Sequence, residues 1–323
     1  MYLLGTSVKD EGPALLEWVA YHLSIGFDHI IIAYNNCSDG CDKLIEALGK
    51  RDDVTAIENI LAPDQPPQIN AIRKIRQTEL FKQATYYMHL DADEFLNIHT
   101  GDQSVATLAE VLGNNDVLSV NWASFGPKEE NVASPDWVTT RFLHRMSEEK
   151  FASKLCKSFI RKPQRFSEIR IHGPSQKKDK SPTYVLRDYG KVIKSGKNAS
   201  VADVTWSTDF EKRPATYDIA QVNHYITKSM PEFRLRKIRG RGVRKLNSKK
   251  EPEIRHSEKH FKRFLKADVL DESIQPKLRK ARNQARRLLL SPSVALSYYH
   301  CRKIRQKLLK EVGRPWDDRE YRM

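Results

Sequence analysis

Three carboxylates stand together directly after a short apolar stretch that ends at residue 90. The segment is Asp91-Ala92-Asp93-Glu94. Side chains two residues apart on an extended chain project to the same side, so Asp91 and Asp93 are predicted to converge. Two adjacent carboxylates repel each other unless a cation lies beside them, and Mg²⁺ and Mn²⁺ prefer carboxylate and phosphate oxygens. The pattern predicts a metal–diphosphate site, and the alternative is a turn in which the Asp side chains cap backbone N–H groups.

The elements before these acids alternate between strand and helix. Apolar patterning predicts strands at 2–8, 27–34, 54–58 and 85–90, and helices at 13–26, 42–48 and 68–83. Such alternation predicts an α/β protein with an open, mainly parallel sheet and helices on both faces. Ligands of such sheets bind beyond the carboxyl ends of the strands, which is where the acidic segment stands.

The positive charge of the chain is concentrated near its end. The 323 residues carry a formal net charge of +15. Residues 224–323 hold 29 Lys and Arg against 11 Asp and Glu, whereas residues 1–223 hold 27 against 30. This asymmetry predicts a polyanionic partner, and the alternative is a solvated helical face that binds nothing. Apolar residues at 288–290 and 294–299 favour peripheral contact with an anionic membrane, and no RNP or zinc-finger motif supports nucleic acid.

The composition indicates a globular protein of one large domain or two smaller ones. With 39% apolar residues, 14 Gly and four Cys, the chain is neither collagen-like nor a disulfide scaffold. The cysteines lack C-x2-C spacing and fit reduced thiols. The first residues lack the features of a signal peptide, and no apolar run approaches the roughly 18 residues of a spanning helix. These features predict a cytoplasmic protein.

Further candidate residues stand in short segments spread over about residues 2–242. They are Val8-Lys9-Asp10-Glu11-Gly12-Pro13, Asn36-Cys37-Ser38-Asp39-Gly40, His89 to Leu96, Asn121-Trp122, His172-Gly173-Pro174 and Asn223-His224-Tyr225. As a set they resemble the bacterial family 2-like glycosyltransferases with an Asp-x-Asp motif, a group related to family 92. The resemblance implies a Rossmann-like GT-A fold, a nucleotide-diphospho-sugar donor, Mn²⁺ or Mg²⁺, and transfer with inversion to the hydroxyl of a glycan or glycolipid acceptor.

The resemblance also implies roles for single residues. The residues that would bind the nucleotide-sugar are Thr6, Lys9, Glu11, Asn36, Asp39 and Asp91. The metal ligands would be Asp93, Asp91 and His224, with Asp91 binding the ribose or a metal-bound water. The acceptor side would include Trp122, His172 and Asp136. For the two histidines the alternative is a residue satisfied by hydrogen bonds. For Trp122, which follows a further predicted strand at 117–120, the alternative is a place in the core. Asp10 and Asn35-Asn36 depart from the usual residues of the group, which leaves base recognition open.

Transfer also needs a general base that deprotonates the acceptor hydroxyl. The candidates are Glu94, Asp136, Glu129 and Glu130, and their spacing favours none of them. With Asp91 and Asp93, Glu94 completes the predicted catalytic group. Arg239 and Arg241 are candidates for stabilising the diphosphate.

The sequence thus predicts a GT-A domain over residues 1–242 and a basic helical region over 243–323. Within the domain, 1–120 would bind the nucleotide-sugar and 121–242 the acceptor. The predicted function is a metal-dependent inverting glycosyltransferase of surface-glycan assembly, of the lipopolysaccharide or capsule type. The alternatives are a nucleic-acid-binding protein that uses the basic region, or a nucleotide-sugar hydrolase.

Overall fold

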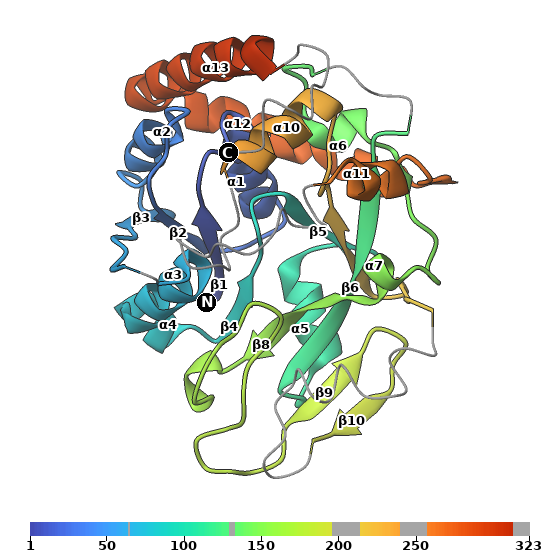
Figure 1. Cartoon of the computed structure of the whole chain (residues 1–323). Coiled ribbons are helices and arrows are strands. Elements are labelled where there is room, and N and C mark those ends of the chain that lie inside the picture. The colour runs from blue at the N-terminus through green and yellow to red at the C-terminus, as the bar shows by residue number, and fades with distance from the viewer. Residues whose placement is uncertain (64, 129–132, 196–213, 240–256, 313–323) are drawn as a thin grey trace.

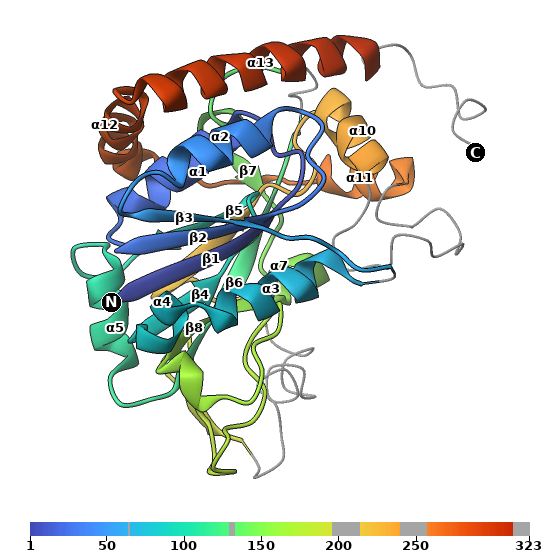
Figure 2. The same ribbon diagram turned by 90° about the vertical axis from the view of Figure 1, so that its left-hand side faces the viewer.

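A mixed sheet of twelve strands runs through the molecule, and helices cover both of its faces (Figures 1 and 2). The computed structural model describes residues 1–63, 65–128, 133–195, 214–239 and 257–312. The strands are β1 (Tyr2–Val8), β2 (His29–Tyr34), β3 (Val54–Glu58), β4 (Tyr86–His89), β5 (Glu94–Ile98), β6 (Val117–Gly126), β7 (His144–Arg145), β8 (Cys156–Arg161), β9 (Tyr184–Arg187), β10 (Val192–Lys194), β11 (Ala220–His224) and β12 (Val269–Leu270).

The helices follow the strands in the alternation that the sequence predicts for the first hundred residues. They are α1 (Ala14–Ser24), α2 (Cys41–Leu48), α3 (Pro67–Gln77), α4 (Glu79–Gln83), α5 (Val105–Leu112), α6 (Val138–Arg141), α7 (Phe151–Lys154), α10 (Met230–Arg239), α11 (Glu258–Phe264), α12 (Leu278–Leu289) and α13 (Pro292–Val312). Gly26, with φ +102°, stands just past α1, where a left-handed backbone favours glycine.

The strand order explains why the acidic segment lies at an edge where ligands bind. Strands β3, β2, β1 and β4 pair in parallel, so their carboxyl ends meet at one side of the sheet. Strand β8 then pairs antiparallel with both β4 and β6. The predicted α/β class and the open, mainly parallel Rossmann-like sheet are confirmed.

Alternating strand residues build a core on each face of the sheet. Leu4 and Ile30 pack with apolar residues of α1, α2 and α5. Leu3 and Ile31, their chain neighbours, pack on the other face with residues of α3 and α4. Both faces are buried because successive side chains of a strand point to opposite sides, so the strands are apolar throughout. These cores fix the positions of the loops at the carboxyl ends.

Two of the predicted elements were wrong in their extent. The helix expected at 68–83 is divided at Thr78, which has extended dihedral angles of φ −71° and ψ 151°. The Thr78 hydroxyl accepts a hydrogen bond from the Phe81 N–H, so it caps a second helix instead of continuing the first. The strand expected at 117–120 continues to Gly126, and therefore Asn121 and Trp122 lie within β6.

The C-terminal helices pack on the domain that the sequence places before them. Helix α12 packs against α1, and α13 packs against α2 and α10 (Figures 1 and 2). A Cβ on Gly40 would lie 3.0 Å from Ile304 Cδ1, which shows how closely α13 approaches the start of α2. The predicted boundary between residues 242 and 243 lies outside the described residues. Among the described helices, none combines the length and apolar character needed to cross a membrane.

Candidate active site

A tight turn joins β4 to β5 and carries the two aspartates. Residues 91–93 are not extended, so the expectation that Asp91 and Asp93 project to the same side from an extended chain was wrong. Two hydrogen bonds close the turn: the Asp91 N–H donates to Glu94 Oε2 at 2.8 Å, and the Glu94 N–H donates to the Asp91 carbonyl at 2.9 Å. Because the turn rotates the chain, each aspartate meets different partners.

Asp91 faces a buried lysine on the neighbouring antiparallel strand. Lys157 of β8 is fully buried, and its Nζ lies 3.5 Å from Asp91 Oδ2 and 3.1 Å from Glu94 Oε2. Gln68 donates a hydrogen bond to Asp91 Oδ1. Burial opposes the charge of Lys157, but Asp91 and Glu94 outweigh it and raise the pKa of the amine. For Glu94 burial outweighs the lysine, and the pKa of this carboxyl lies well above its usual value.

Asp93 is buried on the other side of the turn, against two other basic side chains. Its Oδ2 pairs with Arg236 Nη1 of α10 at 3.0 Å, and its Oδ1 lies 3.6 Å from His224 Nε2. Burial alone would raise the pKa of Asp93, but Arg236 and then His224 outweigh it, so this pKa lies well below its ordinary value. Asp93 is therefore a charged carboxylate at the mouth of the sheet.

His224 ends β11 and has no hydrogen-bond partner among the described residues at either ring nitrogen. The pairing of β11 with β5 sets it opposite Glu94. Its ring centroid lies 4.3 Å from that of Trp122, whose indole lies 5.5 Å from the ring of His172. By contrast, His172 Nδ1 lies 3.0 Å from the Cys156 carbonyl. A buried imidazole without partners is costly, and this disfavours the alternative of a hydrogen-bonded histidine at position 224.

Asp93 and His224 fit part of a divalent metal site. Their nearest atoms are too far apart for a hydrogen bond, and neither nitrogen of the buried His224 ring has a hydrogen-bond partner among the described residues. In the described part of the chain, no group of three His, Cys, Asp or Glu side chains is placed to hold a metal ion. Mg²⁺ commonly takes one or two carboxylates and completes its shell with water and substrate phosphates. The donor set therefore suits an ion that arrives with a diphosphate.

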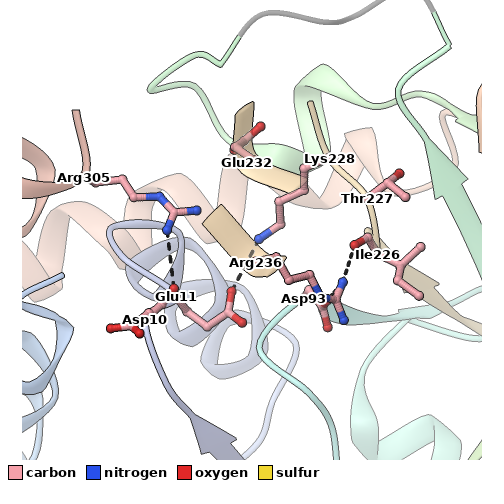
Figure 3. A pocket seen from close by; sticks show the side chains of 9 residues that line it. All are labelled: Asp10, Glu11, Asp93, Ile226, Thr227, Lys228, Glu232, Arg236 and Arg305. Atoms are coloured by element: carbon pink, nitrogen blue, oxygen red, sulfur yellow. Dashed lines mark hydrogen bonds and ion pairs between the residues drawn. The ribbon is translucent and has the colours of Figure 1, made fainter. Parts of the chain in front are cut away.

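A charged pocket opens beside Asp93 (Figure 3). It is lined by Asp10, Glu11, Asp93, Ile226, Thr227, Lys228, Glu232, Arg236 and Arg305. Lys228 Nζ lies 3.5 Å from Glu11 Oε2, and Arg305 Nη1 donates to the Asp10 carbonyl at 3.4 Å. The cavity left between these side chains is about 20 Å³, the space of roughly one water. A larger ligand must displace the basic side chains from their present partners.

The residues predicted to bind the nucleoside lie at the ends of β1 and β2. Thr6 is fully buried, and among the described residues its hydroxyl has no hydrogen-bond partner. Lys9 is half-buried, and Asn36 is exposed with φ +45°. Asp39 is fully buried beneath α13, 3.9 Å from Arg305, and its Oδ1 accepts a hydrogen bond from the Cys41 N–H. The structure thus brings these loops together but covers Asp39.

The candidates for a general base lie in different surroundings. Glu94 is enclosed with Lys157, whereas Asp136 is exposed and accepts a hydrogen bond from the Ser134 hydroxyl at 2.7 Å. Glu129 and Glu130 lie outside the described residues, as does Arg241. Arg239 is the last residue of α10.

Four basic residues at the site were missed by sequence reasoning: Lys157, Lys228, Arg236 and Arg305. Lys157 had a signal, because it stands alone in the otherwise uncharged run 155–160, and buried lysines are nearly always paired. Arg236 had none, because it belongs to a helix with several basic residues that resembles a solvated surface.

The open α/β sheet, with a charged carboxylate and a pocket lined by both acidic and basic side chains at the carboxyl end of β4, defines an enzyme-like site for a charged ligand. Residues 10–265 match the sequence model of glycosyltransferase family 92. The chain belongs to this family, and the protein is a glycosyltransferase, which uses a sugar donor and an acceptor. The resemblance to glycosyltransferases is thereby confirmed for family 92, while the closer relation to family 2 and the role of the Asp-x-Asp motif stay predictions.

Comparison with solved structures gives a weak likeness. HddC from Yersinia pseudotuberculosis is 12% identical, with a TM-score of 0.30 over 50% of this chain and 77% of that chain. A comparison with curated proteins finds no match.

Proposed function

We propose that the pocket beside Asp93 binds a nucleotide-diphospho-sugar and that the protein transfers the sugar, with inversion, to an acceptor hydroxyl. The observation that carries this proposal is the buried, charged Asp93 carboxylate 3.6 Å from the imidazole of His224, which has no hydrogen-bond partner in the part of the chain that the structure describes. In a metal-dependent reaction, Asp93 and His224 would hold Mn²⁺ or Mg²⁺. Such an ion supplies a Lewis acid that neutralises the leaving diphosphate.

The basic residues of the pocket have a role in the same step. Arg236 and Lys228 each face a carboxylate in the structure, Asp93 and Glu11 respectively (Figure 3). A diphosphate in the pocket offers both side chains more oxygen acceptors than one carboxylate does. As the bond to the sugar breaks, the leaving oxygen gains negative charge, and these two cations, once paired with the diphosphate, stabilise it.

The remaining residues position the two substrates in this proposal. Thr6, Lys9 and Asn36 lie at the ends of β1 and β2, where they would contact the nucleoside, and Asp91 would meet the ribose while Lys157 keeps it charged. Of the described candidates for the general base, the exposure of Asp136 favours it over Glu94, because an acceptor hydroxyl can reach a carboxylate only where it is accessible.

The outer face of the C-terminal helices supports peripheral contact with an anionic membrane. Residues 273–310 contain no Asp or Glu. Leu290 and Leu296 are 81% and 75% exposed among exposed basic residues of α12 and α13. Such a surface buries its apolar residues in the lipid interface while its cations meet acidic headgroups. We place the reaction at the cytoplasmic face of the membrane, in surface-glycan assembly.

A nucleotide screen tests the proposed function. Thermal shifts are recorded for UDP, GDP and CDP with and without Mn²⁺, because a ligand that binds only the native state raises its melting temperature. We expect one nucleotide to stabilise the protein only with Mn²⁺, and Asp93→Asn to lose this shift while Asp52→Asn, an exposed control, keeps it. The absence of any nucleotide shift would reject the donor site, and sugar release without an acceptor would indicate a hydrolase.

A further inference from the structure

A second, larger cavity continues from the pocket beside Asp93. This groove has a volume of about 500 Å³, within the usual range for pockets that bind small ligands. It shares Glu11, Lys228, Glu232 and Arg305 with the smaller pocket. Its walls are the start of α1, residues 133–141, α10 and α13. A molecule in the groove would therefore lie next to the proposed donor.

One wall of the groove is a single face of α13. The lining residues of this helix are Tyr298, Arg302, Arg305, Gln306, Leu309 and Lys310. They recur at helical spacing, while Tyr299 and Lys303 of the adjoining face are exposed. The family match ends at residue 265, so this wall lies beyond the part of the chain that the family defines.

The groove combines aromatic rings with polar groups. Trp137 lines the wall opposite α13, beside Asp136, and Tyr298 lines the α13 wall. Both rings pack against the edge of the core and are partly exposed. The C–H faces of a sugar ring are apolar and pack well on aromatic side chains, while its hydroxyls need polar partners nearby. The lining suits a carbohydrate.

Several charged side chains of the groove are compensated by partners within the protein. Arg141 and Glu232 form a buried ion pair at 3.0 Å, and Lys228 lies beside Glu11. Glu17 accepts hydrogen bonds from the Val138 and Thr139 N–H groups.

The α13 wall keeps a positive charge. Within the described residues, Arg302 and Lys310 pair with no carboxylate, and the Arg302 guanidinium lies 5.8 Å from the centre of the Tyr298 ring. A guanidinium held in this way is preorganised for an anionic group.

We propose that this groove is the acceptor site and that the acceptor sugar is anionic, carrying a carboxylate or a phosphate. The sugar ring packs between Trp137 and Tyr298, and its acidic group pairs with Arg302 and Lys310. The inference rests on the proposed function, because an acceptor is defined only beside a donor site. It adds the chemical class of the acceptor and the part of the chain that selects it.

Saturation-transfer NMR on the full chain tests the proposal with three probes: glucose, glucuronic acid and glucose 6-phosphate. We expect one or both anionic sugars to bind and glucose to bind at least tenfold more weakly, and the pair of probes separates a carboxylate from a phosphate. Arg302→Gln should weaken binding of the anionic sugar about tenfold, the usual effect of losing one charge-assisted contact. Lys303→Gln, which removes the same charge from the adjacent residue, should leave it unchanged.

A second variant separates the aromatic contact from the charge. Trp137→Leu should weaken binding of all sugars, and an unchanged thermal melting temperature shows that it folds. Equal binding of glucose and the acids, binding of none of the three, or equal losses in Arg302→Gln and Lys303→Gln would overturn the proposal. The thermal shift caused by the nucleotide is measured in the same samples. If the shift persists while no sugar binds, only the acceptor inference is rejected. If the shift is absent, the proposed donor site is rejected as well.

Discussion

Asp91 and Asp93 are separated by one residue, yet their carboxylates lie in different surroundings. Asp91 is held by Gln68 and by the fully buried Lys157, which belongs to the sheet itself. Asp93 faces a pocket, where its partner Arg236 is partly exposed and His224 has no hydrogen-bond partner in the described part of the chain.

The difference shows how one motif can serve both structure and chemistry. The Asp91 side is compensated by a cation that cannot leave, which fixes the turn. The Asp93 side is compensated by a cation on a helix that can exchange its carboxylate for a phosphate. We infer that the lysine allows two acids to stand together permanently, and that the second acid holds the metal while the first, fixed by Lys157, meets the ribose.

The largest effect is expected at Asp93. Asp93→Asn removes the charge that would hold the metal and orient Arg236, so kcat/KM should fall roughly 10³-fold. Transfer is measured with the donor that the nucleotide screen identifies, and far-UV circular dichroism checks the fold. Asp91→Asn should cost only about tenfold, since its neighbourhood is satisfied by the protein. Equal losses in the two variants would remove the distinction between them.

For Lys157 and Arg236, the partners of the two aspartates, the larger loss of stability is expected on the Asp91 side. Lys157→Met leaves Asp91 and Glu94 buried without their cation, and the free energy of unfolding should fall by about 3 kcal/mol in urea titrations. Arg236→Met removes a partly exposed partner, and because His224 and Lys228 also compensate the buried Asp93, it should cost less than Lys157→Met, about 1–2 kcal/mol, while kcat falls. A more destabilised Arg236 variant would contradict the division into a structural and a chemical side.

The positions of the strands could be predicted because their signals are local. The apolar runs of β1 to β4 are short, end in turn residues and alternate with amphipathic helices, so their order was visible in the sequence. The interruption at Thr78 was missed because a threonine fits a helix as well as it caps one, and only the packing of α4 decides.

The candidate site was visible only in part. Asp93 follows its strand directly, and His224 was found through the resemblance. The other parts of the site lie far from Asp93 in the sequence. Lys157 follows it by 64 residues, Arg236 lies further on, and Lys310 of the groove wall on α13 follows it by 217 residues. Their proximity depends on strand pairing and helix packing, which spacing does not encode. The basic C-terminal region was predicted from its charge. Its position over Asp39 was not predicted, and neither was the presence of Arg305 in the pocket.

The buried carboxyl of Glu17 extends the comparison, because it accepts hydrogen bonds from the Val138 and Thr139 N–H groups. Burial raises the pKa of Glu17 to about 7, although hydrogen bonds from Thr139 and Val138 lower it. The folded protein therefore binds a proton more tightly than the unfolded chain, whose value is 4.5. The resulting stability is complete below that value and is lost as the pH rises to about 7, a change of roughly 3 kcal/mol.

Carbon-13 NMR of the labelled Glu17 carboxyl measures this titration. Thr139→Val removes the hydroxyl that donates to Glu17 Oε1, so its midpoint should rise further. A midpoint near 4.5 in the folded protein would show that the donors compensate burial completely.

The most direct test of the account is the anomalous scattering of manganese in crystals grown with Mn²⁺ and the nucleoside diphosphate that stabilises the protein. We expect a peak between Asp93 Oδ1 and His224 Nε2, with the diphosphate against it and Arg236 turned from Asp93 to a phosphate oxygen. A nucleotide bound elsewhere, or manganese at Asp91 with the Asp93–Arg236 pair intact, would contradict it.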